Sequence, residues 1–408
     1  MTTEVSKPAE KIGVWIVGAY GDIASTLMAG AIAIRKGLSS NTGLVSELTP
    51  FDHLGLCDLN SLVFAGQDIV VSSVSQAVRD VSERSRTFAP ALVNAISADL
   101  AEIDNRVAVT PALCWNPTKR VPGELSLTQV VTAQRRLLNE FRIAQGLSHV
   151  VVVNLASAEP MPPDDPAHYD LDAFEVSIAN DRKDLIAPSS LYAYAAFQEG
   201  CSHVNFTPCT GANLPALKIL AERLNVPHCG NDGKTGETLI KTALAPMFAV
   251  RNLHVMSWEG FNILGNGDGL TLSNPVNREG KIRNKAAVLD DILGYSPHAG
   301  VTINYVPSLG DWKTAWDFIH FRGFLDVPMT MQFTWQGCDS ILAAPLVIDM
   351  VRFCEFAARH GEGGALNHLA CFFKSPIGVD EMALYKQHGM LVEYAHSHIS
   401  KQQRTDLA

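Results

Sequence analysis

The chain has 408 residues, 47% of them hydrophobic and 18% charged, and a formal net charge of -10. This length predicts about two domains with a sizeable buried core. The acidic balance, without a run of Lys and Arg, excludes nucleic acid as an expected partner. An anionic substrate would therefore need a local basic pocket.

Cysteine usage and the first residues indicate the compartment. The eight cysteines are scattered, without a C-x-x-C pair or a zinc-type spacing, which is typical of reduced thiols in a cytosolic enzyme. The first residues are polar, and no segment approaches the roughly 18 apolar residues of a membrane span. We expect a cytoplasmic protein that does not bind membranes.

The first predicted element is a buried parallel strand over residues 12–18, which are almost wholly apolar. It runs into a turn with Gly18 and Gly21 and then into an alanine-rich helix over residues 27–36. A strand, a glycine turn and a helix N-terminus together form an anion site of the dinucleotide-binding type. The spacing G-x-x-G also fits a simple tight turn.

A second strand is predicted over residues 52–58, ending in an acid. In dinucleotide-binding folds an acid at the end of the second strand binds the ribose hydroxyls, which favours Asp58 as a cofactor ligand. Asp52 competes for the same role.

The pattern of strand, small-residue turn and helix then repeats. Helical periodicity covers residues 74–105 and 126–145, a buried strand covers 149–154, and helix, strand and helix follow over 190–200, 204–208 and 214–224. This order predicts an open, doubly wound parallel α/β sheet, with ligands at the carboxyl edge of its strands.

The pattern changes after about residue 241. Residues 251–264, 300–308 and 325–336 alternate apolar and polar side chains, which predicts a more antiparallel sheet with one face on a core. A long apolar helix over residues 341–357 is suited to packing back against the first domain.

Two polar, glycine-rich turns lie at residues 231–238 and 262–269, and Lys281, Lys285 and Lys313 follow them. Carboxylates and amides bind hydroxyl groups, and ammonium groups bind phosphate or developing oxyanions, so this inventory favours a phosphorylated polyol. Each feature alone is more often an ordinary turn or a solvated lysine.

Taken together, the motifs resemble those of the inositol-3-phosphate synthase (myo-inositol-1-phosphate synthase) family, in its archaeal and bacterial branch. They include Val-Gly-Ala-Tyr-Gly at 17–21 and Asn-Asp-Gly-Lys-Thr-Gly-Glu-Thr at 231–238. The other matching segments are 154–160, 205–208, 262–269, 310–313, 339–346 and 372–376, together with Lys281 and Lys285.

The resemblance implies a Rossmann domain built from both ends of the chain, residues 1–240 and 339–408. It also implies an inserted catalytic and tetramerisation domain of α+β type over residues 241–338, tightly held NAD and a homotetramer. The implied reaction converts D-glucose 6-phosphate to 1D-myo-inositol 3-phosphate by oxidation, enolisation, intramolecular aldol closure and re-reduction with the same cofactor.

The resemblance also implies a set of site residues. The catalytic ones are Asp232, Asp268, Lys281, Lys285, Lys313 and Lys374. The expected cofactor-binding residues are Gly18, Ala19, Tyr20, Gly21, Asp22, Ile23, Asp58, Asn154, Ala156, Ser157, Thr210, Asp232 and Asp268. The expected substrate-binding residues are Asn231, Lys234, Thr235, Asn262, Leu264 and Lys285. A divalent metal or a monovalent cation is left open.

Lys374 stands in an apolar context, Phe-Phe-Lys-Ser-Pro, which is unusual for a solvated ammonium. We expect it to relay a proton during hydride transfer, with Lys281 and Lys313 stabilising oxygen atoms and Lys285 holding phosphate. Ala158, where the family usually has threonine, and Trp312 are departures near the expected pocket. The alternatives are a simple dehydrogenase or cyclase acting on another sugar phosphate, and a catalytically silent NAD-binding homologue.

Overall fold

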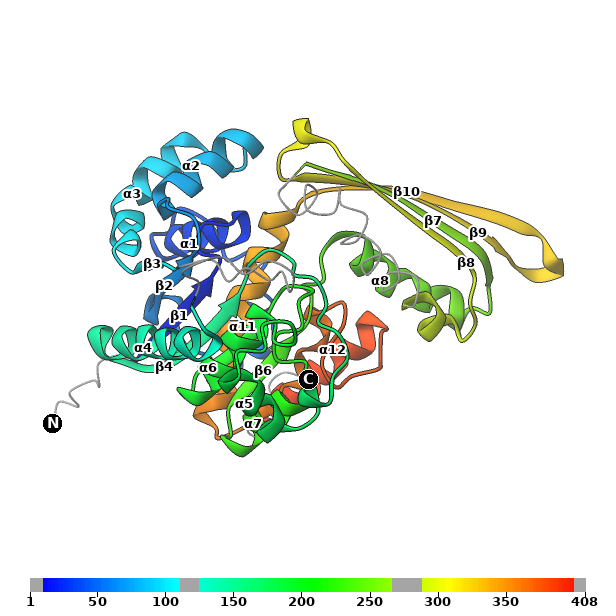
Figure 1. Ribbon diagram of the computed structural model, residues 1–408. Coiled ribbons are helices and arrows are strands. Elements are labelled where there is room, and N and C mark those ends of the chain that lie inside the picture. Colours follow the sequence, from blue (N-terminus) through cyan, green and yellow to red (C-terminus); the bar gives the residue numbers. More distant parts are fainter. Residues whose placement is uncertain (1–9, 111–124, 266–287, 400–408) are drawn as a thin grey trace, which may run out of the picture.

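The computed structural model describes residues 10–110, 125–265 and 288–399, which form two sheets with helices around them (Figure 1). The first sheet has seven strands in the order β11-β6-β5-β4-β1-β2-β3, and every pairing in it is parallel. Its strands are β1 (Lys11–Val17), β2 (Leu62–Asp68), β3 (Val107–Val109), β4 (Leu147–Asn154), β5 (Ser202–Asn205), β6 (Pro227–Gly230) and β11 (Gly364–Ala365). This order is the Rossmann arrangement, which confirms the predicted fold class.

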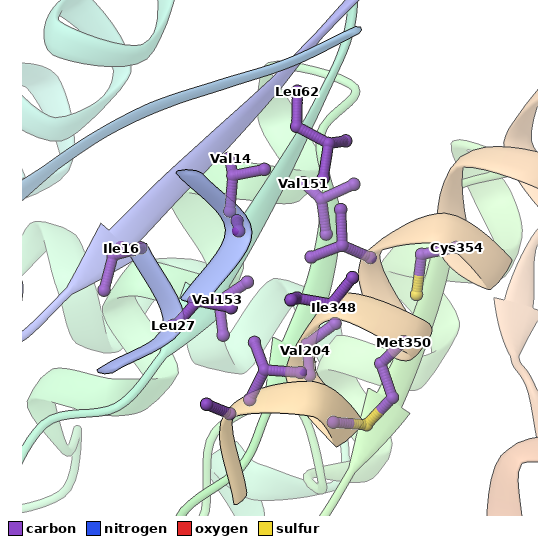
Figure 2. Packing of buried hydrophobic residues seen from close by; sticks show 14 of the residues in the cluster. Val14, Ile16, Leu27, Leu62, Val151, Val153, Val204, Ile348, Met350 and Cys354 are labelled. Carbon is purple, nitrogen blue, oxygen red and sulfur yellow. The ribbon is translucent and has the colours of Figure 1, made fainter. Parts of the chain in front are cut away.

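Helices cover both faces of this sheet, because successive residues of a buried strand point to opposite sides. Val14 and Ile16 pack in one core with α1 (Asp22–Arg35), α2 (Val74–Ser85), α3 (Pro90–Asp104) and α11 (Asp339–Arg359). Figure 2 shows the part of this core that includes Leu27 of α1 and Ile348 of α11. Trp15 and Val17 pack on the other side with α4 (Leu127–Gln145) and α6 (Pro188–Gln198). The remaining helices of this part are α5 (Leu171–Ala179), α7 (Pro215–Arg223) and α12 (Leu384–His398).

The second sheet has four long strands in the order β10-β9-β7-β8 and extends away from the first (Figure 1). They are β7 (His254–Leu264), β8 (His298–Tyr305), β9 (Trp312–Arg322) and β10 (Pro328–Cys338). The β7–β9 and β9–β10 pairings are antiparallel, as expected, whereas β7–β8 is parallel. One face packs on α8 (Gly236–Val250) through a core that includes Phe248, Trp258 and Ile319.

The chain returns to the first sheet without a connecting loop, because α11 begins at Asp339, directly after β10 ends at Cys338. Helix α11 then packs against α1 in the core of the first sheet. The direct connection therefore holds the start of α11 close to two other parts of the chain: the start of the β9–β10 hairpin and the carboxyl edge of the first sheet.

The predicted strand over residues 52–58 is wrong. Phe51–His53 is a single 3-10 turn, and Asp58 caps another short turn whose amide at Asn60 donates to it. The second strand is β2, and Asp58 precedes its amino end. The sequence was misleading because the connection between α1 and β2 contains three short 3-10 turns, and its apolar residues pack on the core without forming a strand.

Candidate functional site

The glycine turn after β1 is shaped for close approach of a ligand. Gly18 has φ +85, and a Cβ there would lie 3.0 Å from the backbone of Ala156, so no other residue fits without strain. Its N–H donates to O of Gln67 at 2.9 Å. Gly21 then begins α1 without a side-chain cap, which leaves the first N–H groups of the helix available to an anion.

The acid at the carboxyl end of β2 is Asp68. Its Oδ2 accepts from N of Tyr20 at 2.9 Å and its Oδ1 from N of Val70 at 3.1 Å. Asp58 was expected to bind the ribose because it was placed at the end of the second strand. Asp68 holds that position in the structure, so the same reason applies to Asp68. The signal in the sequence was present, since Leu62–Asp68 is a mostly apolar run that ends in Gln67 and Asp68.

Two cavities meet at the glycine turn. The first, of about 520 Å³, is lined by Gly18, Tyr20 and Asp68 among others, and the second, of about 310 Å³, by Thr207, Asp232, Thr235 and Lys374 among others. Both share the lining residues Gly21, Asp22, Arg84, Leu155, Ala156 and Ser157. A ligand with two halves joined by an anionic bridge fits this layout, because the bridge would lie at the start of α1.

The second cavity is bordered by a short antiparallel ribbon that joins distant parts of the chain. N of Lys374 donates to O of Asp232 at 2.7 Å, and N of Asn231 donates to O of Ser375 at 2.9 Å. The side chains repeat the pairing, since Nζ of Lys374 lies 2.8 Å from Oδ1 of Asp232. An ammonium and a carboxylate, both mostly buried and both facing the cavity, are a suitable pair for moving a proton.

Lys313 lies on β9 beside the start of α8. A Cβ at Gly236, the first residue of α8, would lie 3.0 Å from Nζ of Lys313. An anionic oxygen at this point would be stabilised both by the ammonium and by the helix N-terminus. The neighbouring Thr235 donates to Oδ1 of Asp339 at 3.0 Å and lines the second cavity.

Several expected site residues are turned to other partners. The Nζ of Lys234 is buried and donates to Oε1 of Gln387 on α12, and burial lowers the pKa of this lysine to about 8. The amide of Asn262 donates to Oε2 of Glu237 at 2.6 Å, and Leu264 packs with Ile303. None of these three side chains lines either cavity.

The side chains of Asn154, Asn231 and Thr210 line neither cavity and instead contact the neighbouring loops. Oδ1 of Asn154 accepts from N of Ala156 at 3.2 Å, which shapes the wall shared by both cavities. Asn231 donates to O of Cys209 and O of Thr210. The hydroxyl of Thr210 lies beside the sulfur of Met161.

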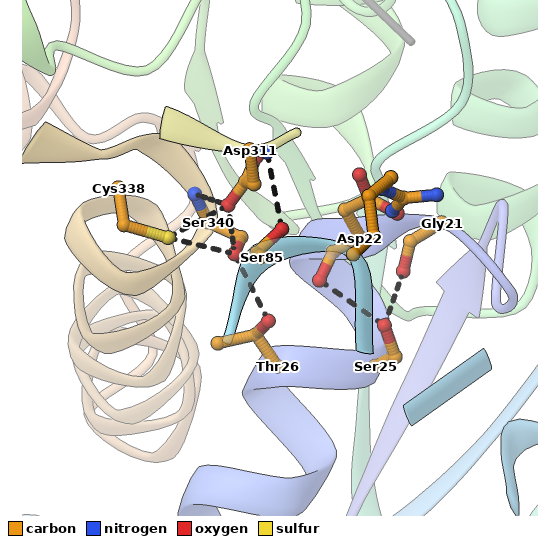
Figure 3. Close-up of polar contacts among 9 residues, drawn as sticks. Gly21, Asp22, Ser25, Thr26, Ser85, Asp311, Cys338 and Ser340 are labelled. Carbon is orange, nitrogen blue, oxygen red and sulfur yellow. Dashed lines mark hydrogen bonds and ion pairs between the residues drawn. The ribbon is translucent and has the colours of Figure 1, made fainter. Parts of the chain in front are cut away.

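Asp311 ties four segments together beside the glycine turn (Figure 3). Its Oδ2 accepts from N of Ser340 at 2.8 Å, and its N donates to Oγ of Ser85 at 3.0 Å. The hydroxyl of Thr26 on α1 completes the junction by donating to Oγ of Ser340 at 3.1 Å. The bulky Trp312 donates from Nε1 to O of Ser85 at 2.8 Å, so its indole is engaged by the end of α2.

Burial shifts the titration of two acids that line the cavities. It raises the pKa of Glu159 to about 7, although N of Ser189 donates to its carboxylate. It also raises the pKa of Asp22, an effect that the nearby Arg84 opposes and Asp311 reinforces. Both acids belong to the first cavity, and Asp22 also borders the second.

A family model for NAD-binding proteins, described as myo-inositol-1-phosphate synthase, matches residues 12–395. The chain belongs to this family. The match confirms the resemblance found in the sequence and NAD as the cofactor. We call the first cavity, which is lined by Gly18 and Asp68, the dinucleotide cavity.

Individual relatives agree with the family. The chain is 34% identical to inositol-3-phosphate synthase 1 of Bacteroides thetaiotaomicron, over 92% of each protein, and 28% identical to that of Homo sapiens, over 88% of this chain and 70% of the human protein. Its fold is similar to that of the crystal structure of inositol-3-phosphate synthase from Caenorhabditis elegans, with a TM-score of 0.85, 24% identity, and coverage of 96% of this chain and 86% of that one. A myo-inositol-1-phosphate synthase-related protein from Thermotoga maritima gives a TM-score of 0.76 at 22% identity, over 95% of this chain and 98% of that one.

Three of the expected site residues belong to a part of the chain that the structure does not describe. Asp268, Lys281 and Lys285 lie outside the described residues. Within residues 10–110, 125–265 and 288–399, no group of three or more His, Cys, Asp or Glu side chains is arranged to hold a metal ion. Over the same residues, no helix is long and apolar enough to cross a membrane.

Proposed function

We propose that this chain is an NAD-dependent inositol-3-phosphate synthase, which converts D-glucose 6-phosphate to 1D-myo-inositol 3-phosphate. The steps are oxidation, enolisation, intramolecular aldol closure and re-reduction. The observation that carries the proposal is the Lys374–Asp232 ion pair, at 2.8 Å, in the cavity that adjoins the dinucleotide cavity. Membership of the family and identity to named synthases over nearly the whole chain support it.

The residues around the glycine turn would hold the cofactor. The backbone of Gly18 to Asp22 and the start of α1 would bind the diphosphate, and Asp68 would accept hydrogen bonds from ribose hydroxyls. NAD supplies a hydride acceptor for the oxidation and, in its reduced form, a hydride donor for the final reduction. The Ala156 and Ser157 wall, held by Asn154, separates the two cavities without closing either.

Lys374 and Asp232 would move the proton that accompanies the hydride. When the sugar hydroxyl is oxidised, its proton would pass to the Lys374–Asp232 pair, whose Nζ and Oδ1 atoms lie 2.8 Å apart. The same proton returns to the oxygen when the ketone is reduced. The lysine therefore ends each cycle in the state in which it began, as a reaction without net redox change requires.

Lys313 would stabilise the oxygen that becomes an alkoxide or enolate during enolisation and ring closure. Its ammonium beside the N-terminus of α8 offers two positive partners to one oxygen. Lys281 would share this task, Lys285 would hold the phosphate, and Asp268 would serve cofactor and substrate. Of the residues expected to bind substrate, Thr235 lines the cavity directly, whereas Asn231, Lys234, Asn262 and Leu264 would act by supporting its loops.

We further propose that the division into residues 1–240, 241–338 and 339–408 holds, with the second sheet as the assembly domain of a cytoplasmic homotetramer. The face of that sheet opposite α8 exposes an aromatic pair, Phe261 and Trp316, whose ring centroids lie 5.2 Å apart. Exposed aromatic surface of this kind favours association. Sedimentation of the purified chain would measure the assembly state.

The test of the activity is incubation of the purified chain and catalytic NAD with carbon-13-labelled glucose 6-phosphate, followed by NMR and by absorbance of NADH. Inositol phosphate without net NADH supports the synthase. Stoichiometric NADH with an open-chain keto product would identify a dehydrogenase instead. Parallel reactions with Mg²⁺ or ammonium test the cation, and a lack of turnover in all of them with several sugar phosphates would indicate a silent homologue.

A further inference from the structure

Arg84 stands where the two cavities meet. It is the penultimate residue of α2 and lines both the dinucleotide cavity and the cavity that contains Lys374. Its Nη2 donates to Oδ1 of Asp22 at 2.6 Å, and Asp22 is the first residue of α1. The guanidinium is therefore fixed beside the helix N-terminus at which a diphosphate would bind.

The charge of the first cavity makes this position significant. Among the described residues that line it, Asp22, Asp68, Asp80 and Glu159 are acids, and Arg84 is the only lysine or arginine. A diphosphate carries two negative charges, and an acid-lined cavity repels it unless a cation is near. Backbone N–H groups and a helix dipole supply only partial charges.

The arginine retains the capacity to bind a second anion. The bond to Asp22 uses one of the five N–H donors of a guanidinium, and the planar fork suits phosphate oxygens. The side chain is about 42% exposed, so its remaining donors reach solvent or a ligand. The ion pair thus orients the guanidinium of Arg84 and leaves its other N–H donors available to a ligand.

The inserted segment that precedes Lys313 supports this arginine. A Cβ at Gly310 would lie 2.8 Å from O of Arg84 and 3.2 Å from its Cγ, so the glycine packs directly on it. Asp311 and Trp312 bind the next residue, Ser85, through its hydroxyl and its carbonyl oxygen. Two parts of the chain more than two hundred residues apart thereby fix the end of α2.

We propose that Arg84 binds the diphosphate of the dinucleotide cofactor, and that residues 310–312 hold it in position for this contact. The inference rests on the proposed NAD-dependent function and adds to it the side-chain cation of the cofactor site. It also places the segment that leads into Lys313 in indirect contact with the cofactor.

The experiment is calorimetric titration of the full chain, freed of copurified nucleotide, with ADP-ribose and with adenosine, which lacks phosphate. Arg84→Gln is expected to weaken ADP-ribose binding about 10- to 100-fold, as for a lost charge-assisted bond, and to leave adenosine binding within about twofold. Arg79→Gln, on the same helix but outside both cavities, should match the wild type. Equal effects of Arg84→Gln on both ligands, or none on ADP-ribose, would overturn the inference.

Further variants separate a direct contact from a merely structural role. Arg84→Lys keeps a point charge and should retain most of the affinity for ADP-ribose. If Arg84 only neutralised Asp22, then Asp22→Asn would make Arg84→Gln harmless in the double variant. A direct contact instead predicts that Arg84→Gln still costs about tenfold in the Asp22→Asn background. A wild-type chain that bound neither NAD nor ADP-ribose would overturn the proposed function itself, and this inference with it.

Discussion

Lys374 and Asp232 are joined twice, through their backbones and through their side chains. The N–H of Lys374 donates to O of Asp232 at 2.7 Å, and its Nζ lies 2.8 Å from Oδ1 of the same residue. The backbone bond fixes where both side chains begin, which holds Nζ within hydrogen-bonding distance of the carboxylate. A residue that takes up and returns a proton in each cycle needs such a fixed partner.

Replacing Lys374 with Met should lower turnover of glucose 6-phosphate by about 100-fold or more, because it removes a proton carrier. Binding of ADP-ribose should stay within a few-fold of the wild type. Lys386→Met is the matched control, since Lys386 pairs with Glu381 at 2.7 Å away from both cavities. Wild-type turnover in Lys374→Met would rule out the assigned role.

Asp68→Asn should weaken binding of NAD about tenfold and reduce the preference of the chain for NAD over NADP, because we assign to this carboxylate the binding of ribose hydroxyls, and it would repel a 2′-phosphate. Asp58→Asn should change neither the affinity for NAD nor the preference for NAD over NADP, since Asp58 lies before the amino end of β2. Equilibrium titration with both dinucleotides measures the two variants. A larger effect at Asp58 than at Asp68 would restore the assignment made from the sequence.

Gly236→Ala should reduce turnover by displacing Lys313, whose Nζ would lie 3.0 Å from the added Cβ. Gly37→Ala is the control, because Gly37 has a similar positive φ of +66 but nothing within 4 Å of its Cβ. Both variants should lose about 1 kcal/mol of stability from the left-handed backbone. Steady-state kinetics and thermal unfolding together separate the two effects, and equal turnover in both variants would contradict the role of Lys313.

The free energy of unfolding should fall as the pH drops below about 6.5, the ordinary pKa of histidine. His203 and His228 face each other on adjacent strands and are fully buried, and burial lowers the pKa of His203 to about 3 and that of His228 to about 4. Below pH 6.5 each histidine binds a proton in the unfolded chain but not in the folded chain. Each therefore lowers the free energy of unfolding by about 1.4 kcal/mol per pH unit between pH 6.5 and about 4.

Urea unfolding of the wild type and of His203→Leu at pH 7.5 and 5.5 measures this loss. The variant should lose about 1.4 kcal/mol less than the wild type over that interval, because one of the two facing histidines is gone. His53→Gln, at an exposed histidine, serves as the control and should follow the wild type. An unchanged loss in His203→Leu would show that other groups cause the acid sensitivity.

Lys241→Met should destabilise the fold by about 3 to 5 kcal/mol, because it leaves a buried carboxylate without its cation. Nζ of Lys241 lies 2.7 Å from Oε1 of Glu237, and both side chains are almost completely buried. The double variant Lys241→Met with Glu237→Gln should recover part of the loss, since the added amide is neutral. Denaturant unfolding measures both, and a double variant as unstable as the single one would contradict this account.

Local patterns in the sequence were sufficient for the elements that are continuous in the chain. The strand before Gly18, the turn and α1 follow one another directly, and their apolar run and glycines were enough to predict an anion site. The long helix after Cys338 was likewise predicted, because it is buried on nearly every side and most of its residues are apolar.

The contacts between distant segments could not be predicted in this way. Arg84 and Asp311 owe their positions to packing between α2 and the inserted sheet, and no periodicity encodes that pairing. The Nζ of Lys234 points to Gln387 on α12 and not into the cavity, and Lys234 follows a turn in which Asp232 has φ +60. The acid of the second strand was misplaced because the connection before β2 contains other carboxylates beside apolar residues that do not form a strand.

The ribbon that pairs Asn231 to Lys234 with Phe372 to Ser375 also has a consequence for biosynthesis. Asp232 leaves the ribosome 142 residues before Lys374, which at ordinary elongation rates is an interval of roughly 7 to 28 s. Throughout that time Asp232 lacks Lys374, the partner to which we assign the proton transfer. The cavity that both residues border is therefore completed only after residue 374 has been synthesised.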